Sequence, residues 1–260
     1  MFAGRAFSGV VHLAAQAGVR FSVDNPLAYI DSNIVGFAHV LEGCRRQGVA
    51  QLIYASSSSV YGNSTQLPWS TTQSVDLPIS VYAATKKSNE LMAHVYAHLY
   101  GLPCTGLRFF TVYGPWGRPD MAYYRFARAI VTGEPITVYN NGKMRRDFTF
   151  IDDVVKVVLQ LIERRGMPVD DESAPPGPPY RLYNVGHHSS VALPDFIALL
   201  EGLLQRKATR VDMPLQPGDV TETFADVSDL LRDTGYAPST SLETGLEAFV
   251  RWFRDYHQVT

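Results

Sequence analysis

Cysteine is scarce in this sequence, with only Cys44 and Cys104 among 260 residues. The two do not form a CxxC pair, and the histidines and cysteines do not have the spacing of metal ligands. A disulfide framework and a zinc site are therefore excluded as the basis of the fold. We expect two buried structural thiols in a reducing cytoplasm, and we expect no metal.

An excess of charge and long apolar runs are also lacking. The formal net charge is −2, whereas nucleic acids and anionic membranes are bound through clustered Lys and Arg. We therefore expect neither as a partner and expect a small-molecule ligand instead. No apolar run approaches the roughly 18 residues of a membrane-spanning helix, and no charged leader with a cleavage site is visible. These absences predict a cytoplasmic protein.

A third absence concerns glycine-rich turns. The GxGxxG and GxxGxxG patterns, which bind the pyrophosphate of dinucleotides after a first strand, occur nowhere in the sequence. The first segment that we predict as a strand begins near residue 9. A dinucleotide site in this chain therefore cannot depend on such a turn.

Short apolar runs that end in small residues predict strands buried on both faces of a parallel sheet. Three such runs cover residues 9–15, 50–62 and 103–114. Between the first two, residues 31–47 carry apolar side chains at helical spacing and are followed by Gly48, which predicts a helix. Strand, helix and strand in this order form a βαβ unit, so we predict an α/β fold with a Rossmann-like, doubly wound parallel sheet.

The pattern changes after Gly114, where a loop rich in proline and glycine leads into further helices and short strands. We predict a partial nucleotide-binding domain of residues 1–114, to which residues 146–186 return. Residues 115–145 and 187–260 are predicted to form a smaller C-terminal substrate-binding domain. Residues 166–180 are rich in proline and acidic side chains, which is typical of a surface insertion.

Tyr82 and Lys86 stand four positions apart at the start of a predicted helix. This spacing alone most often marks a solvated pair on one helical face. A serine run, residues 56–58, ends a predicted strand at the carboxyl edge of the sheet, where open α/β sheets bind ligands. This combination favours a functional site, although we interpret Ser56 and Ser58 as capping or turn hydroxyls.

Six motifs in register resemble the extended short-chain dehydrogenases/reductases, a family that includes the NAD-dependent nucleotide-sugar epimerases and dehydratases. Among these the chain is most similar to the UDP-glucuronate 4-epimerases. The motifs run from Val10 to about Asp229 and read VVHLAAQAGVR, DSNIVG, YASSSSVYG, SVYAATKKSNELMAH, LRFFTVYGPWGRPDMA and RRDFTFIDDV. The resemblance implies an isomerase that oxidises and reduces C4 of a UDP-sugar, with NAD as cofactor.

The resemblance also implies catalytic roles. Tyr82 would take the proton of the sugar 4-hydroxyl while C4 gives hydride to NAD⁺. Lys86 would bind the nicotinamide ribose and lower the pKa of Tyr82. Ser57 would bridge the substrate oxygen and Tyr82, with Ser59 as the neighbouring candidate.

Binding roles follow from the same resemblance. For NAD it implies Leu13, Ala14, Ala15, Asn33, Val112, Tyr82 and Lys86. For the UDP-sugar it implies Thr111 near the C6 carboxylate, Arg118 and Arg146 at the pyrophosphate, and Asp219 at the uridine ribose. Taken alone, each arginine would more often form a surface ion pair.

The chain departs from the family in two places. Related dehydratases carry Asp and Glu where this sequence has Ser58 and Ser59, so epimerisation is favoured over loss of water, with a dehydratase or decarboxylase as an alternative. The family's glycine-rich N-terminal segment is missing. We therefore expect a truncated epimerase with weak or no activity, or else a non-catalytic UDP-sugar-binding remnant.

The resemblance further implies a homodimer that pairs through the helix carrying Tyr82 and the helix before it. Apolar stripes on these helices are formed by Leu91, Val95 and Leu99, and by Phe37 and Leu41. Each stripe could equally belong to the core.

Overall fold

The computed structural model describes residue 4 and residues 6–164, 177–216 and 218–259. Most of the predicted surface insertion at 166–180 lies outside these residues. The strands are β1 (Val10–His12), β2 (Leu52–Ser57), β3 (Cys104–Phe109), β4 (Thr111–Tyr113), β5 (Ile136–Tyr139), β6 (Arg145–Phe150), β7 (Tyr180–Val185), β8 (Ser190–Ala192) and β9 (Arg210–Met213).

The helices cover more of the chain than the strands. They are α1 (Phe21–Asp24), α2 (Pro26–Tyr29), α3 (Gly36–Gln47), α4 (Val81–Tyr100), α5 (Ala122–Thr132), α6 (Ile151–Glu163), α7 (Leu193–Leu204), α8 (Ser228–Thr234) and α9 (Leu242–His257). A π-helical turn, Ile30–Val35, leads into α3, and 3₁₀ turns cover Ser58–Tyr61 and Asn140–Gly142.

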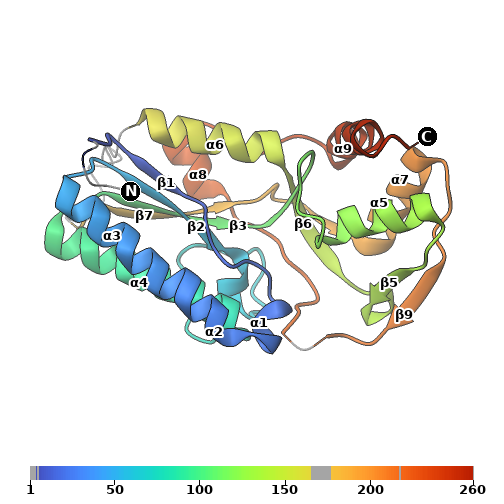
Figure 1. Ribbon diagram of the computed structural model, residues 1–260, viewed down its shortest axis with the longest axis horizontal. Coiled ribbons are helices and arrows are strands. Elements are labelled where there is room, and N and C mark those ends of the chain that lie inside the picture. The colour runs from blue at the N-terminus through green and yellow to red at the C-terminus, as the bar shows by residue number, and fades with distance from the viewer. Residues whose placement is uncertain (1–3, 5, 165–176, 217, 260) are drawn as a thin grey trace.

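A parallel sheet with the order β1-β2-β3-β7 forms the first unit of the molecule. Helices α3 and α4 cover one face and α6 and α8 the other (Figure 1). The apolar residues of β2 alternate between these layers: Leu52 and Tyr54 pack with α3 and α4, and Ile53 packs with α6 and α8. The predicted α/β class and parallel sheet are confirmed, and burial on both faces explains why the strands are apolar throughout.

The second unit has a core of its own, which is rich in aromatic side chains. Strand β6 pairs with β4 in parallel and with β8 antiparallel, and β5 pairs with β9. Helices α5, α7 and α9 pack on these short strands (Figure 1) through Tyr123, Phe148, Phe196 and Phe249. This separate core supports a second unit, but α8 does not belong to it. Leu230 of α8 packs against α6 and the sheet of the first unit, so the assignment of all of 187–260 to one domain is wrong at this helix.

The predicted strand over 103–114 is divided at Phe110. Strand β3 pairs with β2 and β7, whereas β4 pairs with β6 of the second unit. The amide of Val112 donates to the carbonyl of Phe110 over 2.9 Å, which closes a tight turn between the two strands. The chain therefore crosses from one unit to the other at this point, and Thr111 and Val112 lie at the crossing.

The two apolar stripes proposed for a dimer have different environments. Leu91, Val95 and Leu99 are exposed along α4, but Phe37 and Leu41 are completely buried between α3 and the sheet. Of the two alternatives left open for Phe37 and Leu41, the structure gives the core and not an interface. Cys44 and Cys104 lie in the same core, where burial raises the pKa of Cys44 to about 11 and that of Cys104 to about 12.

Two kinds of feature are absent from the described part of the chain. Within it, no helix combines the length and the apolar character needed to cross a bilayer. The same residues contain no group of three or more His, Cys, Asp or Glu side chains placed to hold a metal ion.

Candidate active site

The carboxyl end of β2 and the first turn of α4 bring Ser57, Ser59 and Tyr82 together. Ser80 caps α4, and its hydroxyl accepts from the Ala83 amide over 3.1 Å, which places Tyr82 in the first helical turn. Ser57 is the last residue of β2, and its hydroxyl oxygen lies 3.1 Å from that of Ser59. The Ser57 hydroxyl also acts on Tyr82, where it opposes the rise that burial causes in the pKa of the phenol.

Lys86 lies one helical turn beyond Tyr82 and is almost fully buried. Its ammonium group donates to the carbonyl of Ala55 over 2.7 Å and lies 6.0 Å from the centre of the Tyr82 ring. Burial lowers the pKa of Lys86 to about 8. An ammonium group has three donors, so two remain beside the bond to Ala55 and suit the hydroxyls of a ribose.

Several groups act on the pKa of Tyr82. Burial raises the pKa of Tyr82, while the Ser57 hydroxyl and the positive charge of Arg118 oppose this effect. The Lys86 ammonium group binds the Ala55 carbonyl, and the lowering of the Tyr82 pKa expected from Lys86 and the nicotinamide stays a prediction. The protein's own groups therefore favour the neutral phenol.

Asn33 connects the loop after β1 to the same helical turn. Its Oδ1 accepts from the Gln16 amide over 2.8 Å, and its Nδ2 donates to the Gln16 carbonyl over 2.9 Å and to Thr85 Oγ1 over 3.0 Å. Thr85 in turn donates to the carbonyl of Tyr82 over 2.8 Å. The amide of Asn33 is thus fully used inside the protein, and the structure gives this residue a role in holding the loop.

The remaining predicted cofactor residues line the edge between the units. Leu13 and Ala14 are exposed and Ala15 is half-buried in the loop after β1, while Val112 lies half-buried on β4. Leu13 is 55% exposed, which is unusual for a leucine beside a buried sheet. These residues and the free donors of Lys86 fit the nicotinamide end of NAD. No glycine-rich turn in the chain fits its pyrophosphate.

The predicted substrate residues fall into two places. Nη2 of Arg146 donates to Asp219 Oδ1 over 2.8 Å and to the Val220 carbonyl over 2.7 Å, so the structure brings Arg146 and Asp219 together. Arg118 instead forms a bidentate pair with Asp120, at 3.0 and 2.8 Å. A Cβ placed on Gly18 would lie 3.8 Å from Nη2 of Arg118, so this guanidinium lies beside the loop after β1.

The location of Arg118 bears on its predicted role. Its charge lowers the pKa of Tyr82, whereas the charge that acts on Arg146 from the same loop is that of Arg20. Arg118 and Arg146 thus both border the loop after β1, at Gly18 and at Arg20, and their joint binding of one pyrophosphate stays a prediction. Thr111 lies half-buried on β4, at the crossing between the two units.

Two features of the site gave no recognisable signal in the sequence. The guanidinium of Arg20 lies 4.4 Å from the centre of the Tyr139 ring, which joins the loop after β1 to the end of β5. Beneath the site, Glu90 and Arg108 form a buried bidentate pair at 2.8 and 2.9 Å. Ser56 donates to Glu90 over 2.6 Å, so its interpretation as a capping hydroxyl is wrong.

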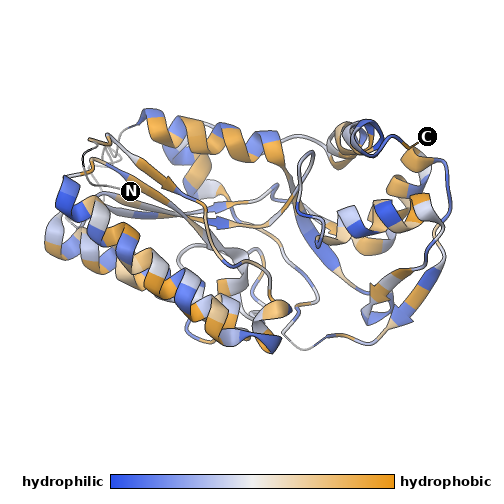
Figure 2. Ribbon diagram, in the orientation of Figure 1, coloured by the Kyte–Doolittle hydropathy of each residue, from blue (hydrophilic) through white to orange (hydrophobic). Residues whose placement is uncertain are grey.

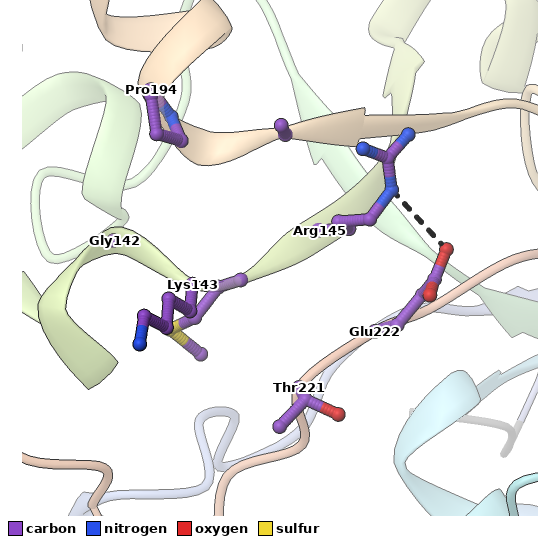
Figure 3. Close-up of a pocket in the computed structure, with 8 residues that line it drawn as sticks. Gly142, Lys143, Arg145, Pro194, Thr221 and Glu222 are labelled. Atoms are coloured by element: carbon purple, nitrogen blue, oxygen red, sulfur yellow. Dashed lines mark ion pairs between the residues drawn. The ribbon is translucent and has the colours of Figure 1, made fainter.

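A shallow pocket of about 350 Å³ adjoins the place of Arg146 (Figure 3), because the carbonyl of Thr221, which lines the pocket, accepts from Arg146 Nη1 over 3.2 Å. It is lined by Arg145 and its ion-pair partner Glu222, together with Lys143 and Thr221. Successive residues of a strand point to opposite faces, so Arg145 and Arg146 of β6 serve different surfaces. The pocket is therefore lined by Arg145 and not by the side chain of Arg146, although both border Thr221.

Comparison with known proteins places these observations in a family. Residues 1–186 match the NAD dependent epimerase/dehydratase family. The chain is 54% identical to Protein CapI of Staphylococcus aureus over 255 residues, which is 96% of this chain and 76% of that protein. It is 48% identical to UDP-glucuronate 4-epimerase 1 of Arabidopsis thaliana, with 97% of this chain and 60% of that protein aligned.

A solved structure shows the same similarity. The UDP-glucuronic acid 4-epimerase from Bacillus cereus, in complex with UDP-glucuronic acid and NAD, superposes with a TM-score of 0.86 at 32% identity. The superposition covers 96% of this chain and 76% of that one. The similarity therefore extends over both units and includes the edge between them.

Proposed function

Because the chain belongs to the NAD dependent epimerase/dehydratase family, we propose that it is an epimerase that interconverts UDP-glucuronate and UDP-galacturonate. The observation that carries this proposal is the meeting of Ser57, Tyr82 and Lys86 at the carboxyl edge of the sheet. Its similarity to UDP-glucuronate 4-epimerases supports the choice of sugar.

In this proposal Tyr82 accepts and returns the proton of the sugar 4-hydroxyl. NAD, when bound, supplies the acceptor for the hydride of C4. Because burial raises the pKa of Tyr82, the phenol needs more positive charge around it before it can act as a base near neutral pH. Ser57 donates to or accepts from the same substrate oxygen, and Lys86 orients the ribose of the cofactor.

The substrate would lie across the boundary of the two units. Arg146 and Asp219 are proposed to bind the uridine diphosphate end, since a guanidinium suits a diphosphate in both geometry and charge. Thr111 and Arg118 are proposed to face the sugar, where Arg118 lies near Tyr82. A uronic acid brings a carboxylate to this end, which a guanidinium and a hydroxyl can both bind.

A dehydratase or decarboxylase is the second candidate. Loss of water needs acidic and basic side chains near C6, whereas Ser58 and Ser59 follow Ser57 in this chain. Neither hydroxyl can replace a carboxylate as a base at neutral pH. This supports retention of the carboxylate and inversion at C4.

Exposed apolar surface supports the proposal that the chain alone binds NAD weakly. The outer edge of β1 pairs with no strand among the described residues, and Val11 of β1 is exposed. On α6, Val155, Leu159 and Ile162 form an exposed stripe at helical spacing, and Figure 2 shows apolar residues along this helix. We propose that a further strand and helix cover this surface in the active enzyme and supply the pyrophosphate site.

The test compares the chain alone with the chain fused behind the glycine-rich N-terminal segment that the family resemblance implies. Products from UDP-glucuronate and NAD are identified by nuclear magnetic resonance. We expect UDP-galacturonate from the fused chain and little or none from the chain alone. A UDP-pentose or a 4-keto-6-deoxy sugar as the main product would contradict the proposal in favour of the second candidate. Binding of UDP without any turnover by the fused chain would support a non-catalytic binding protein.

A homodimer through α4 is a separate proposal. Leu91, Val95 and Leu99 are each about half exposed on one face of this helix, and a symmetric pair of such faces buries them. Sedimentation of the chain should show a dimer that Val95→Asp dissociates. The matched control is Leu231→Asp, an equally exposed position on α8. A wild-type monomer at tens of micromolar contradicts the proposal.

A further inference from the structure

The loop between β4 and α5 carries Arg118 and is packed tightly at two glycines, Gly114 and Gly117. Gly114 has a φ of +143°, and a Cβ there would lie 2.5 Å from Cγ2 of Ile151. A Cβ on Gly117 would lie 1.6 Å from the hydroxyl oxygen of Tyr123. Both positions therefore require glycine, and the backbone on either side of Trp116 is fixed against α5 and α6.

Trp116 has an unfavourable backbone conformation. Its φ of +61° is in the left-handed region, which a bulky side chain rarely adopts. Its side chain is 75% exposed, so burial in the core does not hold it there. Strained residues of this kind persist where surrounding contacts over-determine them, and they cluster at functional sites.

The contacts that hold Trp116 come from the C-terminal helix. Its ring lies 5.4 Å from that of Trp252 and 5.4 Å from that of Tyr256, measured between centroids, and these two rings stack at 5.2 Å. Distances of this size are favourable for aromatic pairs. We call Trp116, Trp252 and Tyr256 the aromatic clamp.

Arg118 depends on its own loop for its position. Its hydrogen bonds go to Asp120, with a longer contact of 3.6 Å to the sulfur of Met121. Both partners are residues of the same loop, and the side chain is about half exposed. The place of the guanidinium relative to Tyr82 is therefore set by the backbone that the aromatic clamp holds two residues earlier.

We propose that the aromatic clamp positions Arg118 for the sugar end of the substrate, so that a face of α9 remote from the reacting atoms controls recognition of the sugar. This inference rests on the proposed function. It assigns Trp116 as a positioning residue and gives a reason for an exposed tryptophan in a strained conformation. If Trp116 affected stability alone, Trp116→Gly would change the melting temperature, because glycine relieves the strain, and would leave the binding of UDP-glucuronate unchanged.

The experiment measures binding of UDP-glucuronate and of UDP to the full 260-residue chain by calorimetry. Trp116→Gly should weaken UDP-glucuronate binding about tenfold without lowering the melting temperature, while UDP binding stays within twofold. Trp116→Phe keeps an aromatic ring in the clamp and should restore most of the affinity. Tyr256→Ala should act in the same direction as Trp116→Gly. Leu231→Ala, an exposed change on α8, is the control.

The outcomes separate the two proposals. Equal binding of UDP-glucuronate by wild type and Trp116→Gly overturns the role of the clamp and leaves the proposed function intact. An equal loss of UDP and UDP-glucuronate binding in Trp116→Gly also overturns it, because the defect is then not specific to the sugar. A wild-type chain that binds neither ligand overturns the proposed function.

Discussion

Beneath Tyr82 the polar side chains are buried and bonded to one another, whereas Arg118 and Arg146 are held by partly exposed loops. Glu90 and Arg108 are about 2% exposed and form a bidentate pair inside the first unit. Arg118 is 45% exposed in its ion pair with Asp120. The reacting end of the site is therefore built before any ligand arrives, and the substrate end is held more loosely.

This difference follows from what each end must do. A proton can move only between groups placed to within a fraction of an ångström, which rigid buried contacts provide. A substrate that enters between two units needs side chains that can exchange their partners. Arg118 and Arg146 form ion pairs with Asp120 and Asp219. A diphosphate or carboxylate of the substrate could compete with these aspartates for the two guanidinium groups.

The largest expected effect is a loss of turnover with UDP binding unchanged. Tyr82→Phe in the fused enzyme should reduce turnover of UDP-glucuronate by about 10²–10⁴-fold, because the proton of the 4-hydroxyl has no acceptor. UDP affinity should stay within twofold, since the nucleotide end is separate. Tyr100→Phe, at the exposed end of α4, is the control and should keep full activity. A Tyr82→Phe enzyme with more than a tenth of the wild-type rate would contradict the role of this residue.

The next effect tests the buried framework. Glu90→Gln leaves Arg108 with an uncompensated charge in the core, and the loss of one partner of such a pair costs about 3–5 kcal/mol of unfolding free energy. Urea denaturation of the chain measures this loss. Glu42→Gln is the control, because Glu42 pairs with Arg45 and Arg46 at the surface and should change the midpoint little. Equal effects of the two substitutions would show that the buried pair is not the framework.

Lys86 should show that a functional group can lower stability. The unfolded chain keeps this proton up to a pH of about 10.5, while burial lowers the folded pKa to about 8. Stability should therefore rise as pH increases from 8 to 10.5. At pH 7 the buried charge costs about 3.4 kcal/mol, and the charge-assisted bond to Ala55 returns about 1.5 of this.

Lys86→Met should accordingly be more stable than wild type by about 2 kcal/mol at pH 7, and the difference should shrink as pH rises toward 10.5. Urea denaturation of both proteins at several pH values checks this. The variant should lose activity in the fused enzyme. A variant less stable than wild type at pH 7 would mean that the Ala55 bond outweighs the cost of burial.

The sequence predicted the elements whose patterns are local. Apolar runs identified the parallel strands, and a helix beginning near Tyr82 was predicted and is confirmed as α4. The division of one predicted strand at Phe110 was missed, because both halves are extended and only their different partners separate them. Helix α8 was assigned to the wrong unit for a similar reason, since seven residues carry too little pattern to show which core they join.

The sequence indicated which residues form the reacting end of the site, but it did not indicate which contacts they make. The spacing of Tyr82 and Lys86 and the serine run marked the reacting end, and the structure brings these residues together. The pair of Glu90 and Arg108 left no signal, because each is an ordinary charged residue in its own segment. The direction of the Lys86 ammonium group depends on the Ala55 carbonyl, which no spacing rule specifies.

The smallest of these effects concerns the nucleotide end, where two neighbouring arginines offer a matched pair. Arg146→Met should weaken UDP binding about 10–100-fold, because a charge-assisted hydrogen bond to phosphate contributes about 1.5–3 kcal/mol. Arg145→Met is the control: Arg145 lies next in the strand but faces the shallow pocket with Glu222 (Figure 3), and UDP binding should stay within twofold. Calorimetric titration of the chain with UDP measures both. Equal losses would mean that general positive charge along β6 attracts the nucleotide. A loss of UDP binding in Arg146→Met but not in Arg145→Met would show that the direction of the Arg146 side chain, and not its charge alone, determines binding of the diphosphate. Arg146 would then bind it although its guanidinium is already bonded to Asp219 and Val220.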